Sequence, residues 1–306
     1  MKISDLLPGQ LALLLRHGNL LLNLAPFVAR LQCDVPSVAS HIALLYPDFE
    51  CSDTASFADF HVQVLREPGF RRWYKPQARF YFDGQASFTP LPAEQGMAMI
   101  EWGLNWCVAA HAHQYLVIHA AVIEKKGVAV VMPAPPGSGK STLCAGLVHR
   151  GWRLLSDELG LYDLRTGLMH GMARPVNLKN ASIEVVGRFA PAAVFTPPVP
   201  DTTKGTVALM RPPTDSVLRR TEAIKVSCVV LPRYQRGSVA CLEQYSRART
   251  FHLLAEQSFN YDIQGVRGFE ALTSLVSQSR CYQFTYSDLN EASASFDGLV
   301  QECLDV

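Results

Sequence analysis

The segment of residues 134–142, APPGSGKST, combines two glycines with a lysine and several hydroxyl side chains. It follows the pattern G-x-x-x-x-G-K-[ST], except that Ala134 stands at the first glycine. Backbone N–H groups of such a loop, and the positive end of the helix dipole behind it, point at one spot and favour a phosphate there. Gly137 and Gly139 provide the backbone freedom for close approach, and an alanine at 134 is tolerated if its φ is negative.

The loop side chains have distinct expected roles. Lys140 would reach the β- and γ-phosphates of a nucleotide, and Ser141 would place its hydroxyl on Mg²⁺. Lys204 lies in DTTKGT, residues 201–206, which is the best candidate for a closing lid because Gly205 permits a hinge. The residues predicted to bind the nucleotide, ATP or another nucleoside triphosphate, are Pro136, Gly137, Ser138, Gly139, Lys140, Ser141, Thr142 and Lys204.

An acidic pair and a histidine are the candidates for chemistry beside the loop. Asp157 and Glu158 follow the apolar residues RLL, and in a parallel sheet the carboxyl end of that strand lies beside the loop. One of these carboxylates can hold Mg²⁺, directly or through water, and the other can act as the base on an attacking hydroxyl. From their order around the loop and the family likeness described below, Asp157 is the predicted base and Glu158 the predicted metal ligand. His119, in the apolar stretch VIHAAVI, would orient Asp157 or add positive charge. Solvated turn acids and a core histidine are the ordinary alternatives.

The elements around the loop form the order strand, loop, helix. Two β-rich runs within 115–134 flank a turn at 124–127, and the second run leads into the loop. A helix is expected at 141–150, ended by Gly151, and a strand carrying the acidic pair at 152–163. This order is the structural context that a phosphate-binding loop requires.

The rest of the chain predicts a small N-terminal α+β unit over 1–90 and a larger domain over 91–306. Alternating and helical periodicities indicate strands at 27–33 and 60–67, helices at 36–46 and 92–113, and a hairpin at 78–91. The proline-rich residues 195–215 are expected to be mostly a loop. A buried strand is expected at 223–233, and the last seventy residues are expected to be helices with one strand at 281–287.

Composition excludes several classes of protein. The 306 residues are 48% hydrophobic and 18% charged, which is typical of a chain with a substantial core rather than a disordered one. The net charge of +1 favours neither a nucleic-acid partner nor a membrane surface. The eight scattered cysteines indicate mostly buried free thiols, and with no targeting or membrane segment expected, the predicted location is the cytoplasm. A homo-oligomer is compatible with this composition.

These motifs, taken in order, resemble the catalytic core of bacterial HPr kinase/phosphorylase. The match consists of His119-Ala120, Gly139-Lys140-Ser141, the run RGWRL at 150–154, and Asp157-Glu158. The chain is also similar to HPr-kinase-related kinases of bacterial peptide-modification gene clusters, where the likeness extends through 174–187, 203–213 and 229–234. Ala134 and Glu158 depart from the family pattern, which has glycine and aspartate there.

The resemblance implies a fold shared with phosphoenolpyruvate carboxykinase, in which a P-loop helix packs on a mixed, strongly twisted sheet. It also implies a Mg²⁺-dependent kinase that phosphorylates a hydroxyl of a protein or of a ribosomal precursor peptide, possibly encoded nearby. Two other functions remain open: a kinase for a small metabolite, and a nucleotide-gated binding module without turnover.

Overall fold

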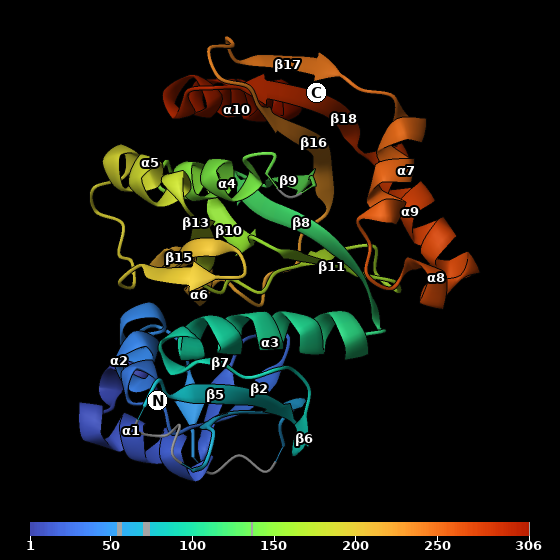
Figure 1. Cartoon of the computed structure of the whole chain (residues 1–306). Coiled ribbons are helices and arrows are strands. Elements are labelled where there is room, and N and C mark those ends of the chain that lie inside the picture. The colour runs from blue at the N-terminus through green and yellow to red at the C-terminus, as the bar shows by residue number, and fades with distance from the viewer. Residues whose placement is uncertain (54–56, 70–73, 136, 306) are drawn as a thin grey trace.

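The computed structural model describes residues 1–53, 57–69, 74–135 and 137–305, and it has a mixed α/β fold with three β-sheets (Figure 1). A seven-stranded sheet is built by the N-terminal part of the chain, whereas an eight-stranded and a three-stranded sheet are built by the rest. Parallel and antiparallel pairs occur together in the larger sheets, so the expected mixed rather than purely parallel fold is confirmed.

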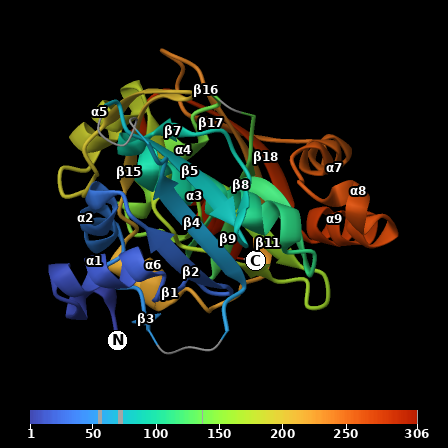
Figure 2. The same ribbon diagram turned by 60° about the horizontal axis from the view of Figure 1, so that its bottom comes forward.

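The N-terminal sheet has the strand order β3-β1-β2-β4-β5-β6, with β7 paired to β5 (Figure 2). Side chains of β2 alternate between buried and half-buried, as the sequence VARLQC predicts. The sequence expectations do not include α1 or β1. The elements of this part are η1 (Ile3–Asp5), α1 (Pro8–His17), β1 (Leu20–Asn23), β2 (Val28–Cys33), α2 (Pro36–Leu45), β3 (Cys51–Ser52), β4 (Phe60–Arg66), β5 (Gln77–Phe82), β6 (Gln85–Ala86) and β7 (Leu91–Pro92).

A long helix, α3 (Gly96–His111), follows the short helix η3 (Ala93–Gln95) and lies between the two larger sheets (Figure 1). On one side, Gly103 packs so closely on the ring of Phe80 in β5 that no Cβ fits between them. On the other side, Val117 and Leu161 of the central sheet belong to the same apolar cluster as α3. One continuous core therefore joins the N-terminal sheet to the rest. The division into domains 1–90 and 91–306 stays a prediction.

The central sheet has the order β12-β11-β8-β9-β16-β18-β17, with β10 paired to β8. Strands β9, β16 and β18 are parallel to one another, and the other pairs are antiparallel. The strand β17 adds to the single strand expected in the last seventy residues. The strands are β8 (Tyr115–Lys125), β9 (Val128–Pro133), β10 (Arg153–Ser156), β11 (Leu159–Asp163), β12 (Met169–His170), β16 (Val226–Tyr234), β17 (Cys241–Gln244) and β18 (Arg280–Tyr286).

Helices cover both faces of the central sheet. The helices α4 (Lys140–Val148) and α10 (Leu289–Leu304) share an apolar cluster on one face, which includes the buried ring of Trp152. On the opposite face, α7 (Arg247–Glu256) and α9 (Val266–Gln278), joined by α8 (Tyr261–Gln264), share another cluster. The sheet is thus buried on both faces.

The three-stranded sheet corrects one expectation from the sequence. Most of 195–215 was expected to be a loop, but β14 (Val199–Thr202) and β15 (Gly205–Met210) form a hairpin, and β13 (Val176–Lys179) pairs with β15. The prolines of this segment are the reason that a loop was predicted. Pro200, however, lies in an edge strand, where its missing N–H does not remove a hydrogen bond between strands. Two short helices, α5 (Ala181–Phe189) and α6 (Thr214–Leu218), complete this part of the chain.

Two further expectations concern membranes and thiols. Among the described residues, no helix is both long and apolar enough to span a bilayer. All eight cysteines are free thiols, and six of them are buried, as expected.

Candidate functional site

The glycine-rich loop connects the end of β9 to the first residue of α4, so the expected strand–loop–helix order is present. Gly137 and Gly139 have φ values of +86° and +89°. A Cβ at Gly139 would also lie 2.5 Å from the hydroxyl of Tyr286, so both conformation and space require glycine there. Ala134 is buried and has a negative φ, which meets the condition for tolerating it. Pro136 lies outside the described residues.

Four of the residues whose buried polar atoms have no hydrogen-bond partner in the described part of the chain lie in or beside this loop. Lys140 is 7% exposed, and its Nζ has no such partner. Asp157 is 4% exposed, and both of its carboxylate oxygens lack one. The hydroxyl of Ser138 and the nitrogen and oxygen of the Asn177 amide are also buried and also lack a hydrogen-bond partner among the described residues. Each such group costs about 1–3 kcal/mol, so their concentration in one place indicates a ligand-binding site.

The strand order places the acidic pair beside the loop. Strand β8 is antiparallel to both β9 and β10, so β9 and β10 run in the same direction and end at the same edge of the sheet. The carboxyl end of β10 therefore approaches the loop as expected. The two strands are separated by β8, however, and are not direct parallel neighbours.

The single strand expected at 152–163 is two strands, β10 and β11, with the acidic pair between them. Both pair with β8, and the register is continuous from Ser156 opposite Val122 to Leu159 opposite His119. The register shifts once, before Ser156, in the manner of a β-bulge. Such bulges re-aim side chains next to functional sites.

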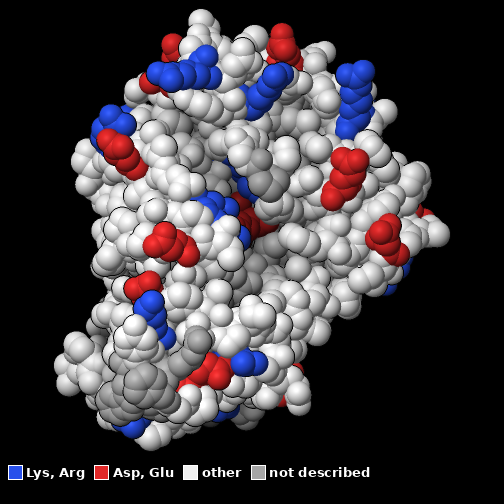
Figure 3. Space-filling model, in the orientation of Figure 1, with Lys and Arg blue, Asp and Glu red and all other residues white. Residues whose placement is uncertain are grey.

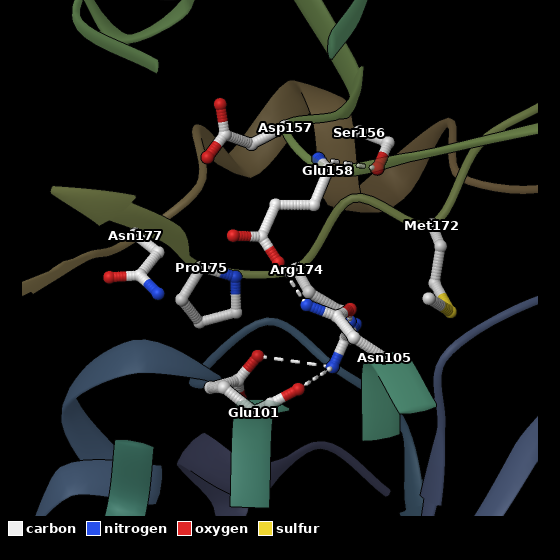
Figure 4. Close-up of a pocket in the computed structure, with 9 residues that line it drawn as sticks. All are labelled: Glu101, Asn105, Ser156, Asp157, Glu158, Met172, Arg174, Pro175 and Asn177. Carbon is white, nitrogen blue, oxygen red and sulfur yellow. Dashed lines mark hydrogen bonds and ion pairs between the residues drawn. The ribbon is translucent and has the colours of Figure 1, made fainter. Parts of the chain in front are cut away.

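Asp157 and Glu158 point in different directions (Figure 4). The two residues form a bend between the end of β10 and the start of β11. One oxygen of Glu158 accepts a hydrogen bond from the Asn105 amide on α3. The same glutamate also lines the cleft at the loop.

Asp157 and Lys140 shift each other's titration. Burial raises the pKa of Asp157 to about 6, the charge of Glu158 adds to this rise, and Lys140 opposes it. Burial also lowers the pKa of Lys140, while Asp157 and Glu158 counteract that effect. Ser141 and the backbone of Asn177 lie close enough to stabilise the Asp157 carboxylate, although neither forms a hydrogen bond of good geometry with it. A carboxyl group with a pKa near 6 is suited to act as a base close to neutral pH.

His119 lies on β8, lines the same cleft and is paired across the sheet with Leu159, next to Glu158. Its backbone N–H donates to the carbonyl of Gln257, and its ring centroid is 5.8 Å from that of Phe259. Burial, and secondly the charge of Lys140, lower the pKa of His119 to about 4. The imidazole is therefore neutral at pH 7, which favours the orienting role over the supply of positive charge.

Two adjoining clefts meet at the loop. The first, of about 310 Å³, is lined by the loop together with His119, Glu158, Asn177 and Lys179. The second, of about 380 Å³, shares Gly137 and Gly139 with it but is walled by Val185, Tyr234, Tyr286 and Leu289. Figure 3 shows a hollow near the middle of this face, with basic and acidic side chains at its floor. The polar cleft suits a phosphate chain, and the aromatic one suits a nucleobase.

Two lysines outside the loop, Lys179 and the predicted Lys204, occupy different places. Lys179 lines both clefts. Lys204 lies in the turn between β14 and β15, with its ammonium 4.9 Å from the ring centroid of Trp102, and it does not line either cleft. The part of Lys204 in nucleotide binding stays a prediction.

Sequence reasoning missed the amide of Asn177, which belongs to β13 and faces the acidic pair (Figure 4). Its stretch, RPVNLK, carried a family likeness but no pattern that singles out an asparagine. It also missed Asn105, Glu101 and Arg174, which come from α3 and from the segment before β13. Only tertiary packing brings these side chains to Glu158.

The residues present fit a nucleotide with Mg²⁺. Among the described residues, the buried Lys140 ammonium and the Asn177 amide have no hydrogen-bond partner and match phosphate oxygens, as does the N-terminus of α4. Ser141 and Glu158 line the first cleft and are the oxygen donors that could hold Mg²⁺. Asp157 does not line this cleft; it lines the adjoining small pocket with Asn105 and Asn177, close enough to Ser141 and Glu158 for them to shift its pKa. No cluster of three or more His, Cys, Asp or Glu suited to a metal occurs among the described residues. Mg²⁺ commonly binds through one or two protein oxygens plus substrate phosphates.

Comparisons with known proteins give one named likeness. No family model matches the chain, and no curated protein matches it. Thirty-three solved chains match its structure, among them one described as the Hpr(Ser) kinase/phosphatase from Coxiella burnetii. That match covers 61% of this chain and 98% of the other, with 12% sequence identity and a TM-score of 0.27. The functional assignment therefore rests on the geometry of the site.

Proposed function

We propose that this chain is a kinase that transfers the γ-phosphoryl group of ATP, with Mg²⁺, to a hydroxyl of a protein or peptide. The observation that carries the proposal is the meeting of Lys140 and Asp157, both buried and without partners among the described residues, at a glycine-rich strand–loop–helix. A cation and a base held together at a phosphate-binding loop are what phosphoryl transfer requires.

Each residue has a defined part in this proposal. The loop N–H groups and Lys140 bind and orient the phosphates, and they balance charge that develops on the transferred group. Ser141 and Glu158 would hold Mg²⁺, which when bound neutralises charge on the phosphates. The oxygen of the acceptor hydroxyl forms a bond to the γ-phosphorus, and the bond from that phosphorus to the bridging oxygen of ADP breaks. Asp157 accepts the proton that the hydroxyl loses. Neutral His119 helps to orient this arrangement.

Two observations favour this function over its alternatives. The raised pKa of Asp157 suits a base, whereas a nucleotide-gated module without turnover needs none. The hollow opens on the molecular surface (Figure 3). An open hollow can admit a protein or peptide, whereas a kinase for a small metabolite would be expected to have an enclosed cavity.

The test is phosphoryl transfer from labelled ATP to a mixture of peptides that each contain one serine, threonine or tyrosine, with phosphopeptides located by mass spectrometry. Lys140→Ala should lower the rate by about 100-fold or more, because the transferring group loses its cation. The exposed Lys225→Ala is the matched control and should keep the full rate. Unchanged transfer by a folded Lys140→Ala protein would contradict the P-loop assignment, and transfer only to small hydroxyl compounds would contradict the acceptor.

A further inference from the structure

A buried chain of polar side chains leads from the N-terminal part of the molecule to Glu158. The hydroxyl of Tyr46, at the end of α2, donates to Glu101. Arg174 donates to the second oxygen of Glu101 at 3.1 Å and to the side-chain oxygen of Asn105. The Asn105 amide then donates to Glu158 (Figure 4). Four separate segments of the chain thus meet, mainly through side-chain hydrogen bonds.

This order of donors fixes the orientation of the Asn105 amide. An arginine can only donate and a carboxylate can only accept, so the amide must turn its oxygen to Arg174 and its nitrogen to Glu158. Glu101 and Asn105 are four residues apart on α3 and therefore lie on one face of the helix. Arg174 is held between them and is itself 6% exposed. The amide is consequently a rigid donor aimed at one oxygen of Glu158.

The charges explain why Glu158 needs such a donor. The cations of Lys140 and Lys204 both lie within electrostatic reach of its carboxylate. A flexible glutamate would turn toward one of these cations. With one oxygen bound to Asn105, the other is left toward the side of Asp157 and Asn177 (Figure 4). Buried ion pairs add little net stability compared with well-packed apolar residues, so stability alone does not account for the Arg174–Glu101 pair.

We infer that Asn105, Arg174, Glu101 and Tyr46 are positioning residues that hold Glu158 ready for a divalent cation, so that helix α3 completes the metal side of the site. This inference rests on the proposed function, which assigns Glu158 to the metal. Side chains that orient a metal ligand typically change metal affinity by about 10- to 100-fold when they are replaced.

The experiment measures binding of Mn²⁺ by electron paramagnetic resonance in the presence of a non-hydrolysable ATP analogue, and therefore does not depend on turnover. Asn105→Leu keeps the size but removes the donor, and Glu101→Gln removes the partner of Arg174. The chain offers a matched control in another buried ion pair, Glu124 with Arg153 at 2.8 Å, which lies at the far end of β8. Glu124→Gln breaks a comparable pair without contact to Glu158.

The expected result is that Asn105→Leu and Glu101→Gln weaken Mn²⁺ binding by about tenfold or more, while Glu124→Gln leaves it unchanged. If Asn105→Leu does not fold, Glu101→Gln alone decides. Mn²⁺ affinity unchanged in the folded variants, but lowered by Glu158→Gln, would overturn the positioning role and leave the proposed function intact. If neither Glu158→Gln nor Lys140→Ala changes Mn²⁺ or nucleotide binding, the proposed function fails and this inference fails with it.

Discussion

Asp157 should determine how the reaction responds to pH. A base acts when it is deprotonated, and burial with the nearby Glu158 raises the pKa of Asp157 to about 6. We therefore expect kcat/KM to rise about tenfold per unit below pH 6 and to level off above it, because kcat/KM follows the free enzyme. His119, with a pKa of about 4, stays neutral across this range.

The pH-rate profile of Asp157→Asn provides the check. This variant should lose at least about 100-fold in transfer rate and should show no inflection near pH 6, while nucleotide still binds. An inflection that persists in Asp157→Asn would assign the base to another group.

The two halves of the glycine-rich loop should respond differently to substitution. Ala134→Gly should change nucleotide affinity by less than about tenfold, because the alanine already has a permitted φ. Gly139→Ala should lower the affinity by more than that, since its φ is +89° and the added Cβ would meet the Tyr286 hydroxyl. Isothermal titration of both variants with a nucleotide analogue tests this, and a large gain in Ala134→Gly would show that the natural loop is impaired.

At the residue scale, local patterns are enough to find the loop, Asp157 and His119. Each is marked by a short motif or by its distance from one. Asn177 and Asn105 have no such mark, because an asparagine is common in turns and on helix surfaces. Their functional position depends on the packing of β13 and α3 against the acidic pair, which a single sequence does not encode locally.

At the element scale, strands with alternating burial, such as β2 and β4, are found from their periodicity. The hairpin of β14 and β15 is not predicted from the sequence because prolines surround it. Strand β17 is not predicted because its side chains are mostly exposed and show no buried face. The break between β10 and β11 is invisible in the sequence, since apolar residues continue on both sides of Asp157 and Glu158. A register shift depends on the partner strand.

Helix α3 provides a prediction at the same scale. Gly103→Ala places a methyl group where the Phe80 ring lies, so the variant should lose about 1–3 kcal/mol of unfolding free energy through overpacking. Gly298→Ala, in α10, meets no atom within 4 Å and should instead gain about 0.5–1 kcal/mol. Urea denaturation of the two variants gives both values, and equal stabilities would contradict the tight contact.

At the scale of the whole molecule, the shared core predicts cooperative unfolding. Residues from the N-terminal sheet, from α3 and from β8 and β11 belong to one apolar cluster, so neither part keeps its buried surface without the other. We expect a single transition in urea, with coincident curves from circular dichroism and tryptophan fluorescence. Two separated transitions would show that the parts 1–90 and 91–306 are independent domains.

The hydrogen bond from Tyr286 to the carbonyl of Gly139 has a consequence for synthesis. It joins residues 147 positions apart. Strand β9 likewise cannot pair with its parallel neighbour β16 until that later strand has been synthesised. A ribosome adding about 5–20 residues per second needs about 7 to 30 s to cover that distance. The glycine-rich loop is thus translated well before the residues that support it, and the complete nucleotide site can form only after Tyr286 has been synthesised.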